Sequence, residues 1–128
     1  MMNFKVVGLD HIVLRTSNTK KMLHFYCDIL GCAVEKQQSE INLTQVRIGE
    51  NLIDLVEVND PLTMEGKNLE HFCLRINPFD YESLQNYFQK HDVALHRYGE
   101  RYSAQGYGWS FYIFDPEGNE VELTGLKK

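Results

Sequence analysis

The sequence has no apolar run near the roughly 20 residues that a membrane-spanning helix requires. Its N-terminal apolar stretch is interrupted by Asp10 and His11, alternates like a strand and lacks a small-residue cleavage site. We therefore expect neither a signal peptide nor a membrane anchor. Clustered basic charge is also missing, since 13 scattered Lys and Arg residues against 18 Asp and Glu give a net charge of -5. This balance argues against nucleic acid as a partner.

Cysteine is scarce and does not form a motif. The three cysteines, an odd number, include no CxxC pair, so a complete intrachain disulfide framework is impossible. Buried reduced thiols in a cytoplasmic protein are the preferred interpretation. What is present is the composition of a globular domain, with 43% hydrophobic and 24% charged residues in a chain of 128. That length suits one compact unit rather than two ordinary domains.

The most informative feature is an internal repeat. Residues 9–15 read Leu-Asp-His-Ile-Val-Leu-Arg, and residues 69–75 read Leu-Glu-His-Phe-Cys-Leu-Arg. Four of these seven positions are identical at an offset of 60, and Asp10 is replaced by the similar Glu70. Later in each half, Ile53-Asp54-Leu55 matches Val121-Glu122-Leu123. Each half thus offers one His in its first strand and one carboxylate in its last strand.

The remaining segments repeat in the same order. Helical spacing of apolar residues predicts helices over 19–31 and 80–91. The expected strands that follow them are 32–39, 42–48 and 51–58 in the first half and 93–101, 109–114 and 120–125 in the second. We therefore predict an α+β fold of two βαβββ modules, residues 6–58 and 68–125, joined by a linker at 59–67.

The matched His and acid residues indicate a metal site. Imidazole and carboxylate together suit divalent ions such as Ni, Zn, Co, Mn or Fe. If the two half-sheets curl toward each other, the matched positions converge and leave a coordination position open for a substrate oxygen or water. The candidate ligands are His11, Asp54, His71 and Glu122.

The alternative is that these histidines belong to the core or are partly exposed, as a lone His in an apolar strand usually is. Two histidines at one place in a repeat, each matched by an acid, favour the metal. Of the neighbouring acids, Glu120 begins its strand and is expected at the exposed rim, and Glu57 faces away from Asp54. The histidines without a repeat partner, expected at the surface or at helix caps, are His24, His91 and His96.

At these residues the chain resembles the vicinal oxygen chelate superfamily. That superfamily includes glyoxalase I, fosfomycin-resistance proteins, methylmalonyl-CoA epimerase, extradiol dioxygenases and bleomycin-resistance proteins. The motifs that carry the resemblance are LDHIVLRT at 9–16, HFYCDILG at 24–31, LEHFCLR at 69–75 and FDPEGNEVEL at 114–123. The resemblance implies a single domain in which paired βαβββ modules form an incomplete mixed β-barrel around a metal, the glyoxalase/dioxygenase-like fold.

The resemblance also assigns ligands. His11 and His71 fall on the family's two first-strand His ligands, and Glu122 falls on its last-strand Glu. Asp54 stands where glyoxalase I-like members carry Glu. This departure leaves open whether three or four side chains hold the metal.

Substrate-binding residues follow from the same resemblance. Arg15 falls where glyoxalase I places an Arg that binds a carboxylate of glutathione, although an ordinary strand Arg at the barrel edge is an equal alternative. The Asn that also contacts glutathione in that family maps to Val58, so specific glutathione use is not supported.

The segment 102–109 is similar to the family's active-site rim. Its glycines Gly106 and Gly108 would let it move over a substrate. Tyr107, Trp109 and Tyr112 would then form an apolar wall for a ligand. The alternative is a plain hairpin with aromatic packing.

The resemblance implies a metal-dependent lyase or isomerase of glyoxalase I type, acting on a small substrate with vicinal oxygens through an enediolate. Glu122 would be both a ligand and the general base, and Asp54 would fill the opposite role. One alternative is a metal-free binding protein of the antibiotic-resistance type. Another is a three-ligand thiol transferase or dioxygenase, although the phosphonate-binding cations of a fosfomycin-type transferase cannot be placed from the sequence. We also expect a homodimer, with the site formed within one chain or across two.

Overall fold

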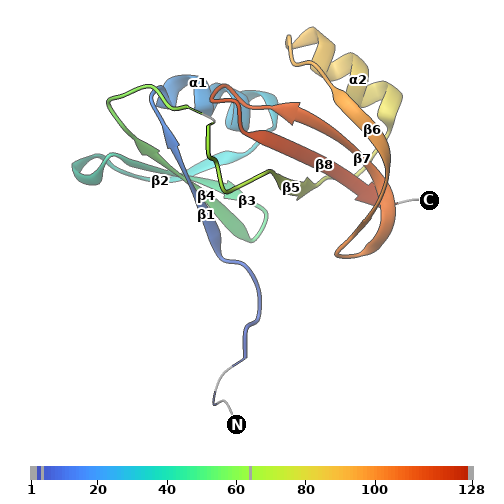
Figure 1. Cartoon of the computed structure of the whole chain (residues 1–128), viewed down its shortest axis with the longest axis horizontal. Helices are drawn as coiled ribbons and strands as arrows, with labels where there is room; N and C mark the ends of the chain where they lie inside the picture. The colour runs from blue at the N-terminus through green and yellow to red at the C-terminus, as the bar shows by residue number, and fades with distance from the viewer. Residues whose placement is uncertain (1–2, 4, 64, 127–128) are drawn as a thin grey trace. The chain divides into compact units, whose positions relative to one another are not determined.

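The structure, a computed structural model, describes residues 3, 5–63 and 65–126. The chain divides between residues 62 and 63 into two compact units. Each unit contains a four-stranded mixed sheet and runs strand, helix, strand, strand, strand, as Figure 1 shows. The predicted α+β fold with two βαβββ modules is confirmed. Within the described residues, no helix is long and apolar enough to cross a membrane.

The first unit forms a sheet in the order β1-β4-β3-β2. Its elements are β1 (His11–Thr16), α1 (Thr19–Leu23), η1 (His24–Ile29), β2 (Ala33–Gln38), η2 (Ser39–Ile41), β3 (Leu43–Ile48) and β4 (Asn51–Glu57). β1 runs parallel to β4, because a helical crossover separates them, whereas the hairpin-connected strands are antiparallel. The predicted helix over 19–31 consists of α1 and the π-helical η1, and it begins at Asn18, whose side chain accepts a hydrogen bond from the Lys21 N–H.

One face of the first sheet packs into the core of this unit. Leu14, Ile53 and Leu55 are buried on that face, together with Met22 and Tyr26 from the helical segment. Because side chains alternate along a strand, the residues between them point to the other face. That other face carries the His of β1 and the Asp of β4.

The second unit forms the equivalent sheet in the order β5-β8-β7-β6. Its elements are β5 (Phe72–Arg75), α2 (Tyr81–Lys90), β6 (His96–Ser103), β7 (Gly106–Phe114) and β8 (Glu120–Leu126). Its core is aromatic: the Phe111 ring of β7 lies 5.6 Å from the ring of Phe79, 6.3 Å from Tyr81 and 5.7 Å from Phe88. Glu122 and Thr124 alternate with the core residue Leu123, so they lie on the opposite face of the sheet.

Of the two interpretations of the segment 102–109, a mobile rim and a plain hairpin, the structure shows a tight hairpin. β6 extends to Ser103 and β7 already begins at Gly106, with Tyr102 paired to Tyr107. Gly106 has a φ of 105°, a conformation that glycine adopts without steric cost and that lets the chain reverse within two residues. The aromatic residues beyond it favour a strand. The hairpin alternative is therefore the correct one.

Candidate metal ligands and their surroundings

In the first unit, His11 and Asp54 lie together on the face away from the core. The distance from His11 Nε2 to Asp54 Oδ2 is 3.8 Å. The parallel register pairs Val13 with Asp54, so the acid lies opposite the residue two places after the His. Asp54 is only 7% exposed, and its Oδ1 accepts a hydrogen bond of 3.2 Å from Gln45 Nε2. A buried carboxylate thus faces a partly exposed imidazole.

Asp10 fixes the orientation of the His11 ring. Asp10 Oδ2 lies 2.8 Å from His11 Nδ1, and because a carboxylate only accepts, Nδ1 is the protonated nitrogen. Nε2 is then the nitrogen directed toward Asp54. The hydrogen bond with Asp10, followed by the charge of Asp54, raises the pKa of His11 above its ordinary value. A carboxylate behind a histidine in this way is the usual support of a metal-ligating imidazole.

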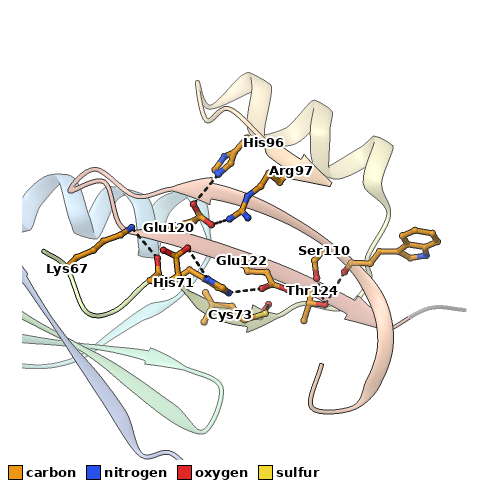
Figure 2. A network of polar contacts seen from close by, with 12 residues as sticks. Lys67, His71, Cys73, His96, Arg97, Ser110, Glu120, Glu122 and Thr124 are labelled. Carbon is orange, nitrogen blue, oxygen red and sulfur yellow. Dashed lines mark hydrogen bonds and ion pairs between the residues drawn. The ribbon is translucent and has the colours of Figure 1, made fainter. Parts of the chain in front are cut away.

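The second unit repeats this arrangement with His71 and Glu122. His71 Nε2 lies 3.2 Å from Glu122 Oε1, as the dashed line in Figure 2 shows. The register pairs Cys73 with Glu122, which gives the same two-residue offset as in the first unit. Glu122 is 6% exposed. Behind the ring, Glu70 Oε1 is 3.7 Å from His71 Nδ1, at the place that Asp10 occupies in the first unit.

The donor set suits a divalent ion. Each unit directs an imidazole Nε2 toward a carboxylate that is almost fully buried, and these are ligand types that Zn, Ni, Co, Mn and Fe accept. His71 Nδ1 is buried and has no hydrogen-bond partner within the described residues. One group whose ligand atoms all lie within 4.8 Å of one another, and which could hold a metal ion, consists of Glu70, His71 and Glu120.

Two predictions around β8 are wrong. Glu120 was expected at an exposed rim, but it is 8% exposed and forms an ion pair with Arg97 (Figure 2). His96 was expected at the surface, but it is half-buried, with Nε2 3.5 Å from Glu120 Oε2 and its ring stacked on Phe114 at 4.4 Å. A β-bulge between His96 and Tyr98, at which Arg97 has a φ of 48°, explains both, because it directs Arg97 toward the acid.

Tyr112 lies on the Glu122 face and contacts His71, a candidate ligand. The two rings meet edge to face with centroids 5.5 Å apart, and the Arg97 guanidinium lies 4.1 Å over the Tyr112 ring. Burial raises the pKa of the Tyr112 phenol, so the hydroxyl keeps its proton at neutral pH. It can therefore donate a hydrogen bond beside Glu122.

Cys73 is a further group beside Glu122 that the sequence did not single out. Although the residue as a whole is exposed, removal of the thiol from water and then the charge of Glu122 raise the pKa of Cys73 to about 12. The thiol is therefore protonated at neutral pH. Such a group is a poor nucleophile, because the reactive species is the thiolate.

The three aromatic residues of β7 do not form one wall. Tyr112 lies on the Glu122 face, but Trp109 points to the other face, where its ring stacks on Tyr98 at 5.8 Å. Tyr107, on the same side as Trp109, is 61% exposed. A shared ligand wall is therefore wrong, because alternation along the strand separates Tyr112 from the other two. Arg15 lies on the His11 face of β1 and is exposed.

A pocket of about 380 Å³ opens beside Glu122 on the second unit. Its lining residues are Cys73, Arg75, Arg101, Tyr102, Ser103, Ala104, Glu122 and Thr124. The two arginines were not identified from the sequence as site residues. Arg75 had a signal, since it occupies the position of Arg15 in the internal repeat.

Residues 8–123 match the model of the Glyoxalase/Bleomycin resistance protein/Dioxygenase superfamily. The chain belongs to this superfamily. It is 28% identical over 121 residues to metallothiol transferase FosB of Staphylococcus haemolyticus. That alignment covers 92% of this chain and 83% of the relative. Among solved structures, a protein from the mobile metagenome of V. Pseudocholerae matches with a TM-score of 0.80 and 23% identity, covering 99% of this chain and 100% of that one.

A lactoylglutathione lyase from Agrobacterium tumefaciens has the same fold, with a TM-score of 0.68, 18% identity and 94% coverage of each chain. The family model establishes the superfamily, and the structural matches establish the glyoxalase-like fold. They do not select one branch, because members of one fold catalyse different reactions.

Proposed function

We propose that this chain is a divalent-metal-dependent lyase or isomerase of glyoxalase I type that acts on a small substrate with two adjacent oxygens. The observation that carries the proposal is the His and acid pair, which recurs in both units with the same strand register. A chance core histidine has no reason to recur with a buried acid at the same offset. The proposed ligands are His11, Asp54, His71 and Glu122.

A divalent ion held by these residues would act as a Lewis acid and stabilise negative charge on a carbonyl oxygen of the substrate. The chain's own groups account for the proton transfer. Glu122, buried and next to His71, is the candidate base that removes a proton from the carbon beside the carbonyl. The Tyr112 hydroxyl can orient that carboxylate, and Asp54 is the candidate for the opposite face of the substrate.

A metallothiol transferase is a second candidate function. The relative at 28% identity carries that name, and the pocket beside Glu122 contains two arginines of the kind that bind a phosphonate. A three-ligand site without Asp54 is also consistent with its surroundings. The Asp54 side chain is one carbon shorter than Glu and accepts a hydrogen bond from Gln45. It lies 3.8 Å from His11 Nε2, whereas Glu122 lies 3.2 Å from His71 Nε2. Cys73 would not be the transferred thiol, because its pKa of about 12 keeps it protonated.

Proton exchange at carbon separates the two reactions. Metal-loaded protein is incubated in D₂O with the thiohemiacetal of a 2-oxoaldehyde, and in a second reaction with a thiol and an epoxide phosphonate. A lyase or isomerase forms a thioester from the first mixture. If the base exchanges its proton with the solvent before returning it, the carbon next to the thioester carbonyl carries deuterium. We expect Glu122→Gln to lower that rate by on the order of a hundredfold or more.

The control is Glu82→Gln, which removes an exposed carboxylate on α2 and is expected to leave the rate unchanged. Consumption of thiol in the second mixture alone would replace the lyase with the transferase. Turnover of neither mixture by protein shown to contain metal would reject both named reactions.

A further inference from the structure

The Glu122 face of the second sheet has a floor of small residues next to the candidate ligands. Thr124 of β8, Ser110 of β7 and Gly99 of β6 are paired neighbours in one row across three strands. Ser110 donates a hydrogen bond of 2.8 Å to Thr124 Oγ1, which Figure 2 shows. Of this row, Thr124 lines a pocket of about 380 Å³, which Glu122 also lines.

Two arginines border this floor from opposite edges of the sheet. Arg75 of β5 pairs with Thr124 in the parallel ladder, and Arg101 of β6 pairs with Gly108 of β7. Both line the pocket. Two arginines from the two edge strands thus line one cavity, together with the hydroxyl side chains of Thr124 and Ser103.

The charges of these two arginines are not neutralised by acids. Within residues 5–63 and 65–126, neither Arg75 nor Arg101 forms an ion pair. Arg101 donates a hydrogen bond of 2.9 Å to the Glu100 carbonyl, a neutral partner. Arg97, on the same strand as Arg101, shows the contrast, because it is paired with Glu120. Two arginines without an ion-pair partner among the described residues therefore line the pocket, where the acid is Glu122.

Gly99 allows Arg101 to take this position. A Cβ atom at residue 99 would lie 2.6 Å from Arg101 Nη1, closer than such atoms approach in proteins. The guanidinium thus lies over the glycine, in space that a side chain at residue 99 would occupy. A side chain at this position would displace the guanidinium without removing its charge.

We propose that Arg75 and Arg101 bind an anionic group of the substrate, a carboxylate or a phosphonate or phosphate, while the rest of the substrate reaches Glu122. A planar guanidinium offers paired donors that match the oxygens of either anion, and the Thr124 and Ser103 side chains add polar groups at the pocket wall. That the bound molecule is a substrate rests on the proposed function. The existence of an anion site does not depend on the proposed function.

The test is a calorimetric or NMR titration of metal-free protein with propionate and with methylphosphonate. Wild type is expected to bind at least one of them saturably. Arg75→Gln and Arg101→Gln should each weaken that binding by on the order of tenfold, since each removes one charge-assisted contact. Gly99→Ala should weaken it by a smaller factor, because the charge of Arg101 remains.

The matched control is Arg47→Gln in the first unit, an arginine already paired with Glu35, which should bind the anion as wild type does. Tighter binding of methylphosphonate identifies a phosphonate or phosphate, and tighter binding of propionate identifies a carboxylate. Absent binding, or binding unchanged in both pocket variants, overturns the proposal.

Metal content, measured on the same samples, separates this inference from the proposed function. Arg75→Gln and Arg101→Gln alter no proposed ligand, so their metal content should equal that of wild type. Metal without anion binding rejects the anion site alone. Arginine-dependent anion binding in a protein that takes up no metal rejects the proposed function alone.

Discussion

At the scale of single residues, the two candidate histidines differ in the support behind the ring. Asp10 contacts His11 Nδ1 at 2.8 Å, whereas Glu70 is 3.7 Å from His71 Nδ1 and so beyond hydrogen-bond distance. His11 is therefore the more firmly oriented of the two, and the hydrogen bond with Asp10, followed by the charge of Asp54, raises its pKa. Protons and metal compete for the same Nε2.

Removal of the Asp10 carboxylate should change how metal binding depends on pH. In wild type, metal affinity should fall as the pH drops through the raised pKa of His11. Asp10→Asn returns that pKa toward its ordinary value, so the fall should move to lower pH. At pH 8 the variant should bind metal roughly tenfold or more weakly, because the ring is less well oriented. Titrations with Ni or Zn between pH 6 and 8 measure both effects.

Asp28→Asn is the control for this change. Asp28 Oδ2 lies 2.9 Å from His24 Nδ1 on the first helical segment, so the variant breaks a similar pair outside the candidate site. It should bind metal as wild type does at every pH. An Asp10→Asn profile that superimposes on the wild-type profile would show that Asp10 does not support a ligand.

The internal repeat is what made the candidate ligands predictable. Each His and each acid could be matched to its counterpart without knowledge of distances. Arg101 has no counterpart, and its position depends on the pairing of β6 with β7 beyond the bulge at residues 96–98. A bulge shifts which side chains share a face, and alternation in the sequence alone does not reveal it. The same bulge brings Glu120 together with Arg97 and His96.

At the scale of elements, parallel pairing of the first and last strands positions each candidate pair. Pairing of β1 with β4 puts His11 beside the strand of Asp54, and pairing of β5 with β8 puts the strand that follows His71 beside the strand of Glu122. The helix before β2 or β6 makes this parallel crossover possible. In the second unit, α2 packs on β7 from the side of the sheet opposite to the candidate ligand Glu122.

Phe111 is the central residue of that packing. It is fully buried between the sheet and the rings of Phe79, Tyr81 and Phe88. Phe111→Ala should lower the free energy of unfolding by about 3–5 kcal/mol, since the variant loses apolar contact and leaves a cavity. Urea denaturation followed by circular dichroism measures the change.

Tyr107→Ala on the same strand is the comparison for Phe111→Ala. The Tyr107 side chain is mostly exposed, so its removal should change the free energy of unfolding by less than about 1 kcal/mol. Equal losses in the two variants would mean that the α2 and β7 interface is not the main support of the second sheet.

At the scale of the whole molecule, the chain is one βαβββ plan used twice. The order of elements followed from the sequence because apolar spacing changes from helical to alternating at similar places in both halves. The ends of strands were less predictable. β7 begins at Gly106 rather than at residue 109, since the hairpin turn needs only the two residues between Ser103 and Gly106. The homodimer and the sharing of one ion between both halves stay predictions.

The central claim is that one divalent ion takes ligands from both halves of the repeat. Metal content by mass spectrometry, on protein purified without chelator, tests it most directly. We predict about one ion per chain in wild type and in the control His24→Ala, and loss of metal in His11→Ala, His71→Ala and Glu122→Ala. Wild-type protein that stays metal-free after reconstitution with Ni, Zn, Mn or Fe would contradict the claim and leave a binding protein. Metal retained in His11→Ala would contradict the shared site and confine the ion to the second unit.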